Sequence, residues 1–254
     1  MRGWLLFGGL CILLIGIAYF LPVQKNCILC APSWKGSWLG TDPLGRDVGI
    51  RLLRAWGITL FISGGSSLVG VALGVILGTL AGSRAGWIDE FISFVAQAFW
   101  VVPTLLWAVV LAFLSGKTLL TLVGAIGLSI WTDTARLTRV EVRRLWRAPF
   151  VEAGQALGLD YFRLLWRHVL PNLRPVMHAQ LLQTFATAAL IEAGLGFVGL
   201  GPSAPHIGLG GLLFEAIQWL TLPQGQLQAF LAGGLLSGTV FAVYSLTGYG
   251  RNPF

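Results

Sequence analysis

Residues 151–158 read Val-Glu-Ala-Gly-Gln-Ala-Leu-Gly, and residues 168–171 read His-Val-Leu-Pro. Both stretches lie in a polar, arginine-rich segment between two long apolar runs. Pro149 suits the first turn of a helix, Glu152 would lie near its positive amino-terminal end, and Gly158 suits a sharp turn at its other end. The pattern predicts a short helix with a small surface, held outside the bilayer and suited to docking.

The composition is that of a helical membrane protein. Hydrophobic residues make up 56% of the 254 residues and charged residues 11%. A soluble domain of this length would need more charge to cover its surface. We therefore predict an all-α, polytopic membrane protein with about six transmembrane helices, each of roughly 20 apolar residues. We place them near residues 4–22, 57–82, 91–114, 119–137, 177–198 and 227–249.

The basic residues predict the topology. The arginines gather in residues 138–176, which indicates a cytoplasmic loop and places both termini in the cytoplasm. Arg46, Arg51 and Arg54 fall on the outer side and fit this rule poorly. No groove-reading helix or aromatic RNA-binding platform accompanies the net charge of +7, so no nucleic-acid partner is expected.

Four glycines recur at intervals of four in the second apolar run: Gly70, Gly74, Gly78 and Gly82. Residues four apart share a helix face, and glycine lets another backbone approach closely. Packing within this chain is the simpler interpretation. A seam that faces a pore or a partner subunit is the alternative.

The loop resembles the EAA signature of ATP-binding-cassette importer permeases, in which Glu-Ala-x4-Gly precedes a Leu-Pro pair. Here Glu152, Ala153 and Gly158 match the first part, and residues 167–172 (Arg-His-Val-Leu-Pro-Asn) take the form of the dipeptide, oligopeptide and nickel branch. Further matches to the C-type permease of that branch are residues 39–47, 86–90, 103–106, 135–139 and 192–201.

The resemblance implies a type I importer permease fold. Residues 1–38 would form a transmembrane anchor helix and an outer loop, and residues 39–254 a permease core with the coupling loop at about 138–176. The chain would lie in the cytoplasmic or inner membrane of a bacterium or archaeon, in contact with the lipid bilayer. Its implied partners are a second permease subunit, two ATP-binding ATPase subunits and an extracytoplasmic substrate-binding protein.

The resemblance also implies a function without catalysis on this chain. Peptides would cross the membrane between the two permeases, with nickel or a metal chelate as the alternative cargo. ATP hydrolysis would occur on the separate ATPase subunits, which agrees with the absence of a Gly-x4-Gly-Lys-Ser/Thr phosphate loop here. No catalytic residue, metal site or cofactor is expected on this chain.

The coupling surface that the resemblance implies consists of Phe150, Val151, Glu152, Ala153, Gly154, Ala156, Leu157, Gly158, His168, Leu170 and Pro171. Gly154 stands where the signature has alanine, and we expect this to loosen the docking helix. Pro171 is expected to break the helix before the chain re-enters the membrane.

The pore candidates are Glu192, Trp100 and Pro103, with Asp133 as a weaker one. An ionisable residue in a membrane span is costly and is a functional candidate by default. If Glu192 faces the pore, it could meet a positive amino group or a cationic metal complex. Cys27 and Cys30 are interpreted as structural cysteines, and a metal site shared with His206 is the alternative.

Overall fold

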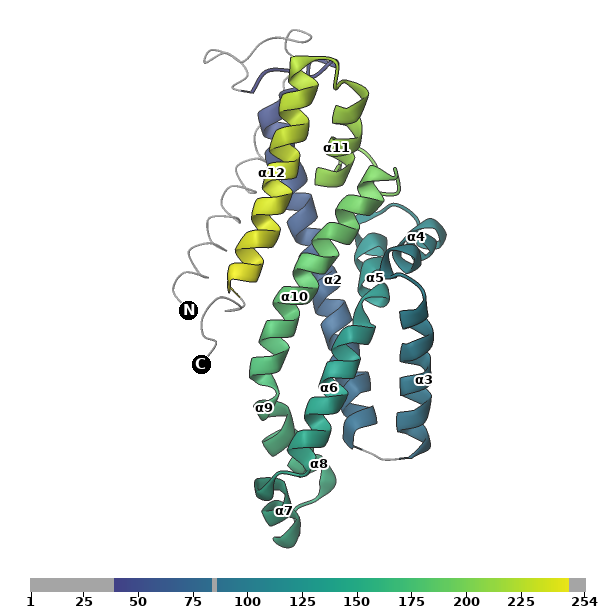
Figure 1. Ribbon diagram of the computed structural model, residues 1–254, viewed down its shortest axis with the longest axis vertical. Helices are drawn as coiled ribbons and strands as arrows, with labels where there is room; N and C mark the ends of the chain where they lie inside the picture. Colours follow the sequence, from purple (N-terminus) through teal and green to yellow (C-terminus); the bar gives the residue numbers. More distant parts are fainter. Residues whose placement is uncertain (1–38, 84–85, 247–254) are drawn as a thin grey trace. The chain divides into compact units, whose positions relative to one another are not determined.

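The computed structural model describes residues 39–83 and 86–246, which fold into helices (Figure 1). Within these two ranges the only β-pairing is an isolated bridge between Thr41 and Asp47. The helices are α2 (Val48–Ser83), α3 (Trp87–Val101), α4 (Thr104–Ser115), α5 (Leu119–Ser129), α6 (Trp131–Trp146), α7 (Pro149–Ala156), α8 (Tyr161–Leu164), the π-helix η1 (Leu165–Val169), α9 (Leu170–Asn172), α10 (Arg174–Phe197), α11 (Leu209–Gln218) and α12 (Pro223–Leu246). The predicted all-α class is confirmed.

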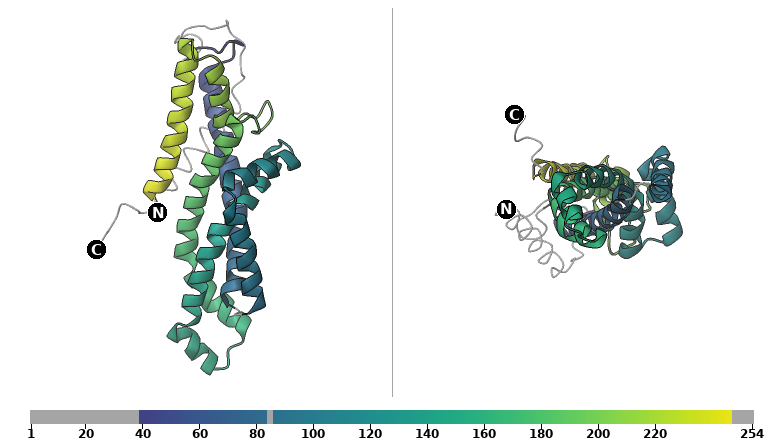
Figure 2. Two further views of the ribbon diagram at one scale, coloured as in Figure 1. Left: turned by 45° about the vertical axis from the view of Figure 1, so that its right-hand side comes forward. Right: turned by 90° about the horizontal axis from the view of Figure 1, so that it is seen from below.

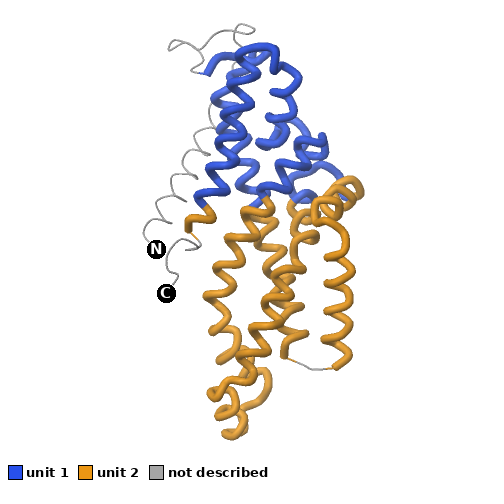
Figure 3. Tube along the Cα trace, viewed as in Figure 1, with its two compact units in different colours: residues 1–63, 115–122, 189–242 blue, residues 64–114, 123–188, 243–254 orange. Residues whose placement is uncertain are grey.

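The described residues fall into two compact units (Figure 3). Unit 1 takes its residues from 1–63, 115–122 and 189–242, and unit 2 from 64–114, 123–188 and 243–254. The unit 1 core joins the start of α2 to α11 and α12 through Val48, Leu52, Ala55, Leu209, Leu212 and Ala232. A core in unit 2 joins α6, α7, η1 and the turn before α10 through Val142, Leu145, Val151, Leu165, Val169 and Leu173.

An ion-pair network in unit 1 anchors the start of α2. Asp42 Oδ2 accepts from Arg46 Nε and from Arg51 Nη1, both at 2.7 Å. Arg51 Nη2 also donates to Glu215 on α11, and Asp47 Oδ1 accepts from the Ile50 amide at 2.9 Å in the first turn of α2. Arg46 and Arg51, which fitted the charge rule poorly, are therefore neutralised by acidic partners.

This network explains why α2 begins earlier than predicted. The expected span began at residue 57, because the arginines before it lower the local hydropathy. The structure begins α2 at Val48, since the Asp47 side chain accepts a hydrogen bond from its first turn and Arg51 finds acidic partners.

The predicted span 91–114 is wrong as a single helix. The structure divides it into α3 and α4, whose axes differ by 92°. The break lies at Val102 and Pro103, and Val102 is extended, with φ −95° and ψ 131°. Proline disfavours the helical conformation in the residue before it, so the bend follows from the sequence.

The predicted span 119–137 is also interrupted, at Ile130, where α5 gives way to α6. α6 then continues to Trp146, well into the segment assigned to the loop. The expected spans 177–198 and 227–249 correspond to α10 and α12, whereas α11 was not predicted. The expected anchor at 4–22 lies outside the described residues.

Between residues 39 and 246, leaving out 84–85, two helices, α2 and α12, are long and apolar enough to cross a membrane by length and composition. The bent pair of α3 and α4 is a third candidate, and α5 and α11 are shorter apolar helices. α10 has 24 residues, as α12 has, but does not reach the same apolarity.

The glycine ladder of α2 packs within this chain, as the simpler interpretation predicted. A Cβ atom on Gly70 would lie 2.7 Å from Ile130 Cγ1, and one on Gly82 would lie 2.7 Å from the Arg139 carbonyl oxygen. A Cβ atom on Gly74 would likewise be too close to Thr134 of α6, and one on Gly78 would be too close to Ala135 and Thr138. These glycines therefore bring α2 against the end of α5 and α6 within unit 2.

Replacing Gly78 with leucine is expected to destabilise the protein by several kcal/mol, since overpacking costs about 1–3 kcal/mol even where side chains can shift. Here a Cβ atom would meet the Ala135 carbonyl oxygen and lie 2.7 Å from Thr138 Cβ. Gly233→Leu on α12 is the matched control, because none of the described residues lies within 4 Å of its Cβ position. Thermal unfolding of the purified protein should show a large drop for Gly78→Leu only; equal drops would contradict the packing assignment.

Candidate functional site

The short helix expected around residues 150–157 is α7, which spans Pro149–Ala156. Pro149 lies in its first turn, where its missing N–H group costs no hydrogen bond. Glu152 also lies in that turn, near the positive end of the helix, and its side chain is exposed. The short helices α7 and α8 lie beyond the end of α6 (Figure 2).

Gly158 ends α7 in a Schellman motif. Its amide donates to the Gln155 carbonyl at 2.9 Å, and the Leu159 amide donates to the Gly154 carbonyl at 3.0 Å. The φ angle of Gly158 is 73°, in the left-handed region that favours glycine. The sharp turn predicted at this residue is present.

The expectation that Gly154 loosens this helix stays a prediction, but the structure gives this glycine a packing role. Gly154 is buried, and a Cβ atom there would lie 2.6 Å from Leu164 Cδ2 and 3.3 Å from Leu159 Cδ1. Leucine side chains therefore occupy the space that an alanine methyl group would need. Val151 is also fully buried, in the core shared with α6 and η1. α7 is thus fixed to unit 2 by one apolar face.

The outer face of α7 is exposed and carries both charge and apolar surface. Leu157 is 82% exposed and Phe150 is 40% exposed. The other exposed residues of this face are Glu152, Ala153, Gln155, Ala156 and Gly158. Phe162 and Trp166 add exposed aromatic side chains from α8 and η1. Large exposed apolar side chains grouped outside a membrane-spanning segment are typical of a protein–protein contact.

Pro171 does not end the helix in which it lies, contrary to expectation. It lies in α9, directly after the π-helix η1, and a single turn residue, Leu173, separates α9 from α10. The Leu170 amide donates to the Leu165 carbonyl, five residues back. This wider turn shifts the carbonyl groups with which the proline ring would clash, so the helical path continues. His168 and Leu170 are half-buried in the same stretch.

Of the pore candidates, Glu192 is the least accessible. It is 1% exposed, and its Oε2 accepts from the Thr59 hydroxyl at 2.9 Å. The Thr59 hydroxyl also accepts from the Leu209 amide at 2.9 Å, which ties α2, α10 and α11 together inside unit 1. Glu192 Oε1 has no hydrogen-bond partner among the described residues.

Trp100 and Pro103 lie at the bend between α3 and α4, and both are exposed. The Trp100 indole Nε1 donates to Asp133 Oδ1 at 2.8 Å, and the Arg136 guanidinium lies 4.2 Å from the centre of the Trp100 ring. A cavity of ≈ 340 Å³ opens beside Trp100, Arg136 and Arg139, and is otherwise lined mainly by apolar residues of α2, α3 and α6.

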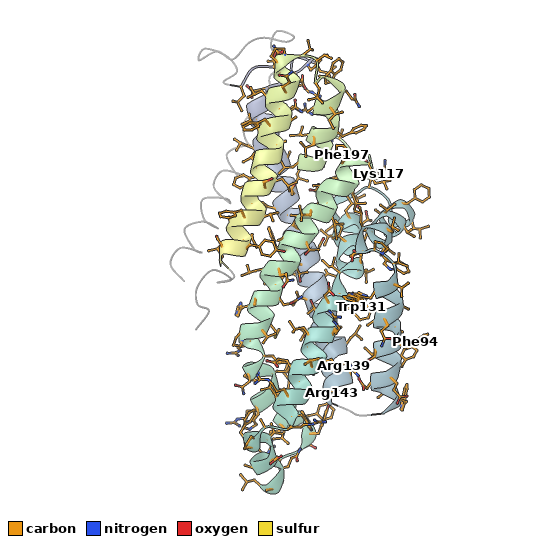
Figure 4. All side chains as sticks on the ribbon, viewed as in Figure 1. Phe94, Lys117, Trp131, Arg139, Arg143 and Phe197 are labelled. Carbon is orange, nitrogen blue, oxygen red and sulfur yellow. The ribbon has the colours of Figure 1, made fainter. Side chains whose placement is uncertain are left out.

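Two arginines of α6 hold the start of α3, a feature that sequence reasoning missed. Asp89 is 7% exposed and accepts from Arg139 Nε at 2.5 Å and from Arg143. Both arginines lie on the side of α6 that faces α3 (Figure 4). Asp89 and Arg139 belong to two of the quoted motifs, but their separation of 50 residues hides the pair from local patterns.

No group of three or more His, Cys, Asp or Glu side chains that could hold a metal occurs among residues 39–83 and 86–246. Cys27 and Cys30 lie outside the described residues. His206, the suggested third ligand, lies in the segment between α10 and α11.

The chain is similar in sequence to a family of transport proteins and to several of its members. Residues 74–249 match the family described as the binding-protein-dependent transport system inner membrane component. Over 210 residues the chain is 33% identical to the oligopeptide transport system permease protein OppC of Bacillus subtilis (strain 168), covering 83% of this chain and 68% of that protein. The dipeptide transport system permease protein DppC of the same organism is 33% identical over 173 residues, covering 68% of this chain and 54% of that protein.

The fold also resembles a solved structure. A chain of the MetNI methionine ABC transporter in an inward facing conformation matches with a TM-score of 0.60 and 19% sequence identity. The match covers 80% of this chain and 97% of that chain. At this identity the similarity concerns the fold alone.

Proposed function

The chain belongs to the binding-protein-dependent transport system inner membrane components, the permeases of ATP-binding-cassette importers, and from this premise we propose that it carries peptides. It forms the translocation path together with a second permease subunit. Two ATPase subunits supply the energy, and an extracytoplasmic binding protein delivers the peptide. Peptide cargo is favoured over nickel or a metal chelate because the relatives are named for oligopeptides and dipeptides.

The observation that carries the coupling part of the proposal is the geometry of α7. One face of this helix is buried against α6 and η1, whereas Phe150, Glu152 and Leu157 point away from the core. A helix held in this way can insert its free face into a groove of an ATPase subunit and transmit force to α6 and α10. Movement of the ATPase pair would then drive alternating access as a rigid-body change.

We further propose that both termini and the segment from α7 to α9 lie on the cytoplasmic side. The arginines of α6 to α10 support this orientation through the positive-inside rule. Arg46 and Arg51 lie on the outer side in this orientation, and each is paired with Asp42 and Glu215.

ATPase activity of the complete complex in lipid tests this proposal. The complex is reconstituted with its two permeases and two ATPase subunits, and binding proteins loaded with peptide or with nickel are added in turn. Peptide-loaded protein is expected to stimulate ATP hydrolysis, and nickel-loaded protein is not. Stimulation by nickel-loaded protein alone would overturn the peptide assignment, and failure of the ATPase subunits to assemble with the permeases would overturn the coupling role of α7.

A further inference from the structure

Asp133 offers an accessible carboxylate in unit 2, unlike the buried Glu192. It lies in the first turn of α6 and is exposed. Its Oδ1 accepts from the Trp100 indole at 2.8 Å. In the described part of the chain this is the one hydrogen bond of the Asp133 carboxylate, and no arginine or lysine lies within ion-pair distance. Its second oxygen is therefore open to a ligand.

The surface next to Asp133 is polar where a membrane-spanning helix would ordinarily be apolar. Gln180, Gln183, Thr184 and Thr187 recur at the intervals that place residues on one face of α10. With Thr104 and Asp133 they line a groove of ≈ 30 Å³. Polar side chains on a membrane-spanning helix face a water-filled path or a protein neighbour rather than lipid, because lipid cannot satisfy their hydrogen bonds. The same residues explain why α10 is less apolar than α12.

Arg136, three residues after Asp133 on α6, forms no ion pair with it. The Arg136 guanidinium stacks on the Trp100 ring, 4.2 Å from its centre. Arg136 lines the larger cavity with Arg139, whereas Asp133 lines the groove beside α10. The indole of Trp100 thus lies between the two charges, bonded to Asp133 through Nε1 and covered by Arg136 on its face. The groove keeps an unpaired negative charge.

We propose that Asp133 binds a cationic group of the cargo, an ammonium or guanidinium, as it passes through the translocation path. Gln183 and Thr187 supply neutral hydrogen-bonding groups along the same groove. A carboxylate in a polar but narrow groove attracts a cation more strongly than one in bulk water, because the surrounding protein screens charge less. This inference rests on the proposed peptide transport and adds that the path favours peptides with an accessible cationic group.

Uptake of matched tripeptides by the complete importer tests the proposal. Wild type, Asp133→Asn and Glu141→Gln are compared in proteoliposomes with the same binding protein. The peptides are alanyl-lysyl-alanine, trialanine and alanyl-glutamyl-alanine, each free and amino-terminally acetylated. Asparagine keeps an acceptor for the Trp100 indole and removes only the charge. Glu141→Gln removes a carboxylate from the same helix, but one already paired with Arg144 at 2.8 Å.

If Asp133 binds the lysine side chain, Asp133→Asn is expected to lower the uptake ratio of the lysine peptide to the glutamate peptide by roughly three- to tenfold, the range of a typical net hydrogen bond. Glu141→Gln should leave this ratio unchanged. A loss for trialanine relative to its acetylated form would identify the amino terminus as the cation, and a loss confined to the lysine peptide would identify the side chain. If neither the lysine-to-glutamate ratio nor the ratio of free to acetylated trialanine changes while the wild type is active, the role of Asp133 is overturned, whereas a wild type that imports no peptide would overturn the proposed function itself.

Discussion

A complex that carries Gly158→Val is expected to lose most of its ATP-driven peptide uptake while still assembling in the membrane. The φ angle of 73° at this position strains a β-branched residue. Relief of that strain would disturb the Schellman hydrogen bonds of Gly158 and Leu159 and so redirect the end of α7. Because Gly158 is exposed and lies outside the core, the rest of unit 2 should fold normally. Uptake and ATPase activity, measured on the same proteoliposomes, would separate coupling from hydrolysis.

Gly116→Val is the matched control for this experiment. Gly116 also has a left-handed φ angle, of 92°, and within the part of the chain that the structure describes nothing lies within 4 Å of its Cβ position. Each substitution should cost about 1–2 kcal/mol of backbone strain, but only Gly158 lies beside the proposed docking surface. Equal losses of uptake in both variants would attribute the effect to strain. Normal uptake by Gly158→Val would show that α7 is not the coupling element.

A second substitution on the same surface avoids backbone strain. Leu157→Asp places a charge on a side chain that is 82% exposed, so it should leave the fold intact. If the apolar surface of α7 lies in an ATPase groove, the buried charge would weaken that contact. The ATPase subunits are expected to dissociate from the permease more readily, which co-purification at increasing salt would measure.

The sequence predicted α7 well because its signals are local. Pro149, Glu152 and Gly158 lie within ten residues, and each acts on the backbone or the helix dipole near its own position. The glycine ladder of α2 also predicted a helix-packing face correctly. The sequence did not predict which helix packs against it, because any helix with a suitable surface would satisfy the same pattern.

The features that were missed depend on residues far apart in the chain. Arg51 contacts Glu215, 164 positions away, and Arg139 contacts Asp89, 50 positions away. Such pairs lower the free-energy cost of placing charged residues in a helix. Hydropathy alone does not include this effect, so it placed the start of α2 too late in the chain. The bend at Pro103 could have been predicted from the sequence, because proline restricts the conformation of Val102. It was missed because the surrounding apolar run is long enough for one continuous span.

The sequence also could not show which of Glu192 and Asp133 is accessible to a ligand. Sequence reasoning favoured Glu192 because of its place within an apolar run. Accessibility is a property of the packed helices, and it leaves Glu192 bonded to Thr59 inside unit 1 while Asp133 faces a polar groove in unit 2. Ionisable residues in membrane spans need such a three-dimensional test before a role can be assigned.

Asp42→Ala is expected to cause the largest loss of stability in unit 1. Asp42 Oδ1 accepts from the Leu44 and Arg46 amides at 2.9 and 2.8 Å, and Oδ2 accepts from both neighbouring guanidinium groups. Asp42 is 3% exposed, so its removal leaves buried donors without acceptors and leaves Arg51 with Glu215 alone. Breaking a buried ion pair costs about 3–5 kcal/mol, a large share of the stability of most domains.

Thermal unfolding of the purified complex would measure this loss, with Glu141→Gln as the control. Arg144, the partner of Glu141, is 70% exposed, and such surface pairs contribute about 0–1 kcal/mol. Asp42→Asn separates the two roles of the carboxylate, because it retains an acceptor for the two amides but turns an amide donor toward the guanidinium groups. An unfolding temperature close to that of wild type for Asp42→Asn would assign the stability to the turn and not to the ion pairs. A small loss for Asp42→Ala, similar to that for Glu141→Gln, would contradict the anchoring role of the network at the start of α2.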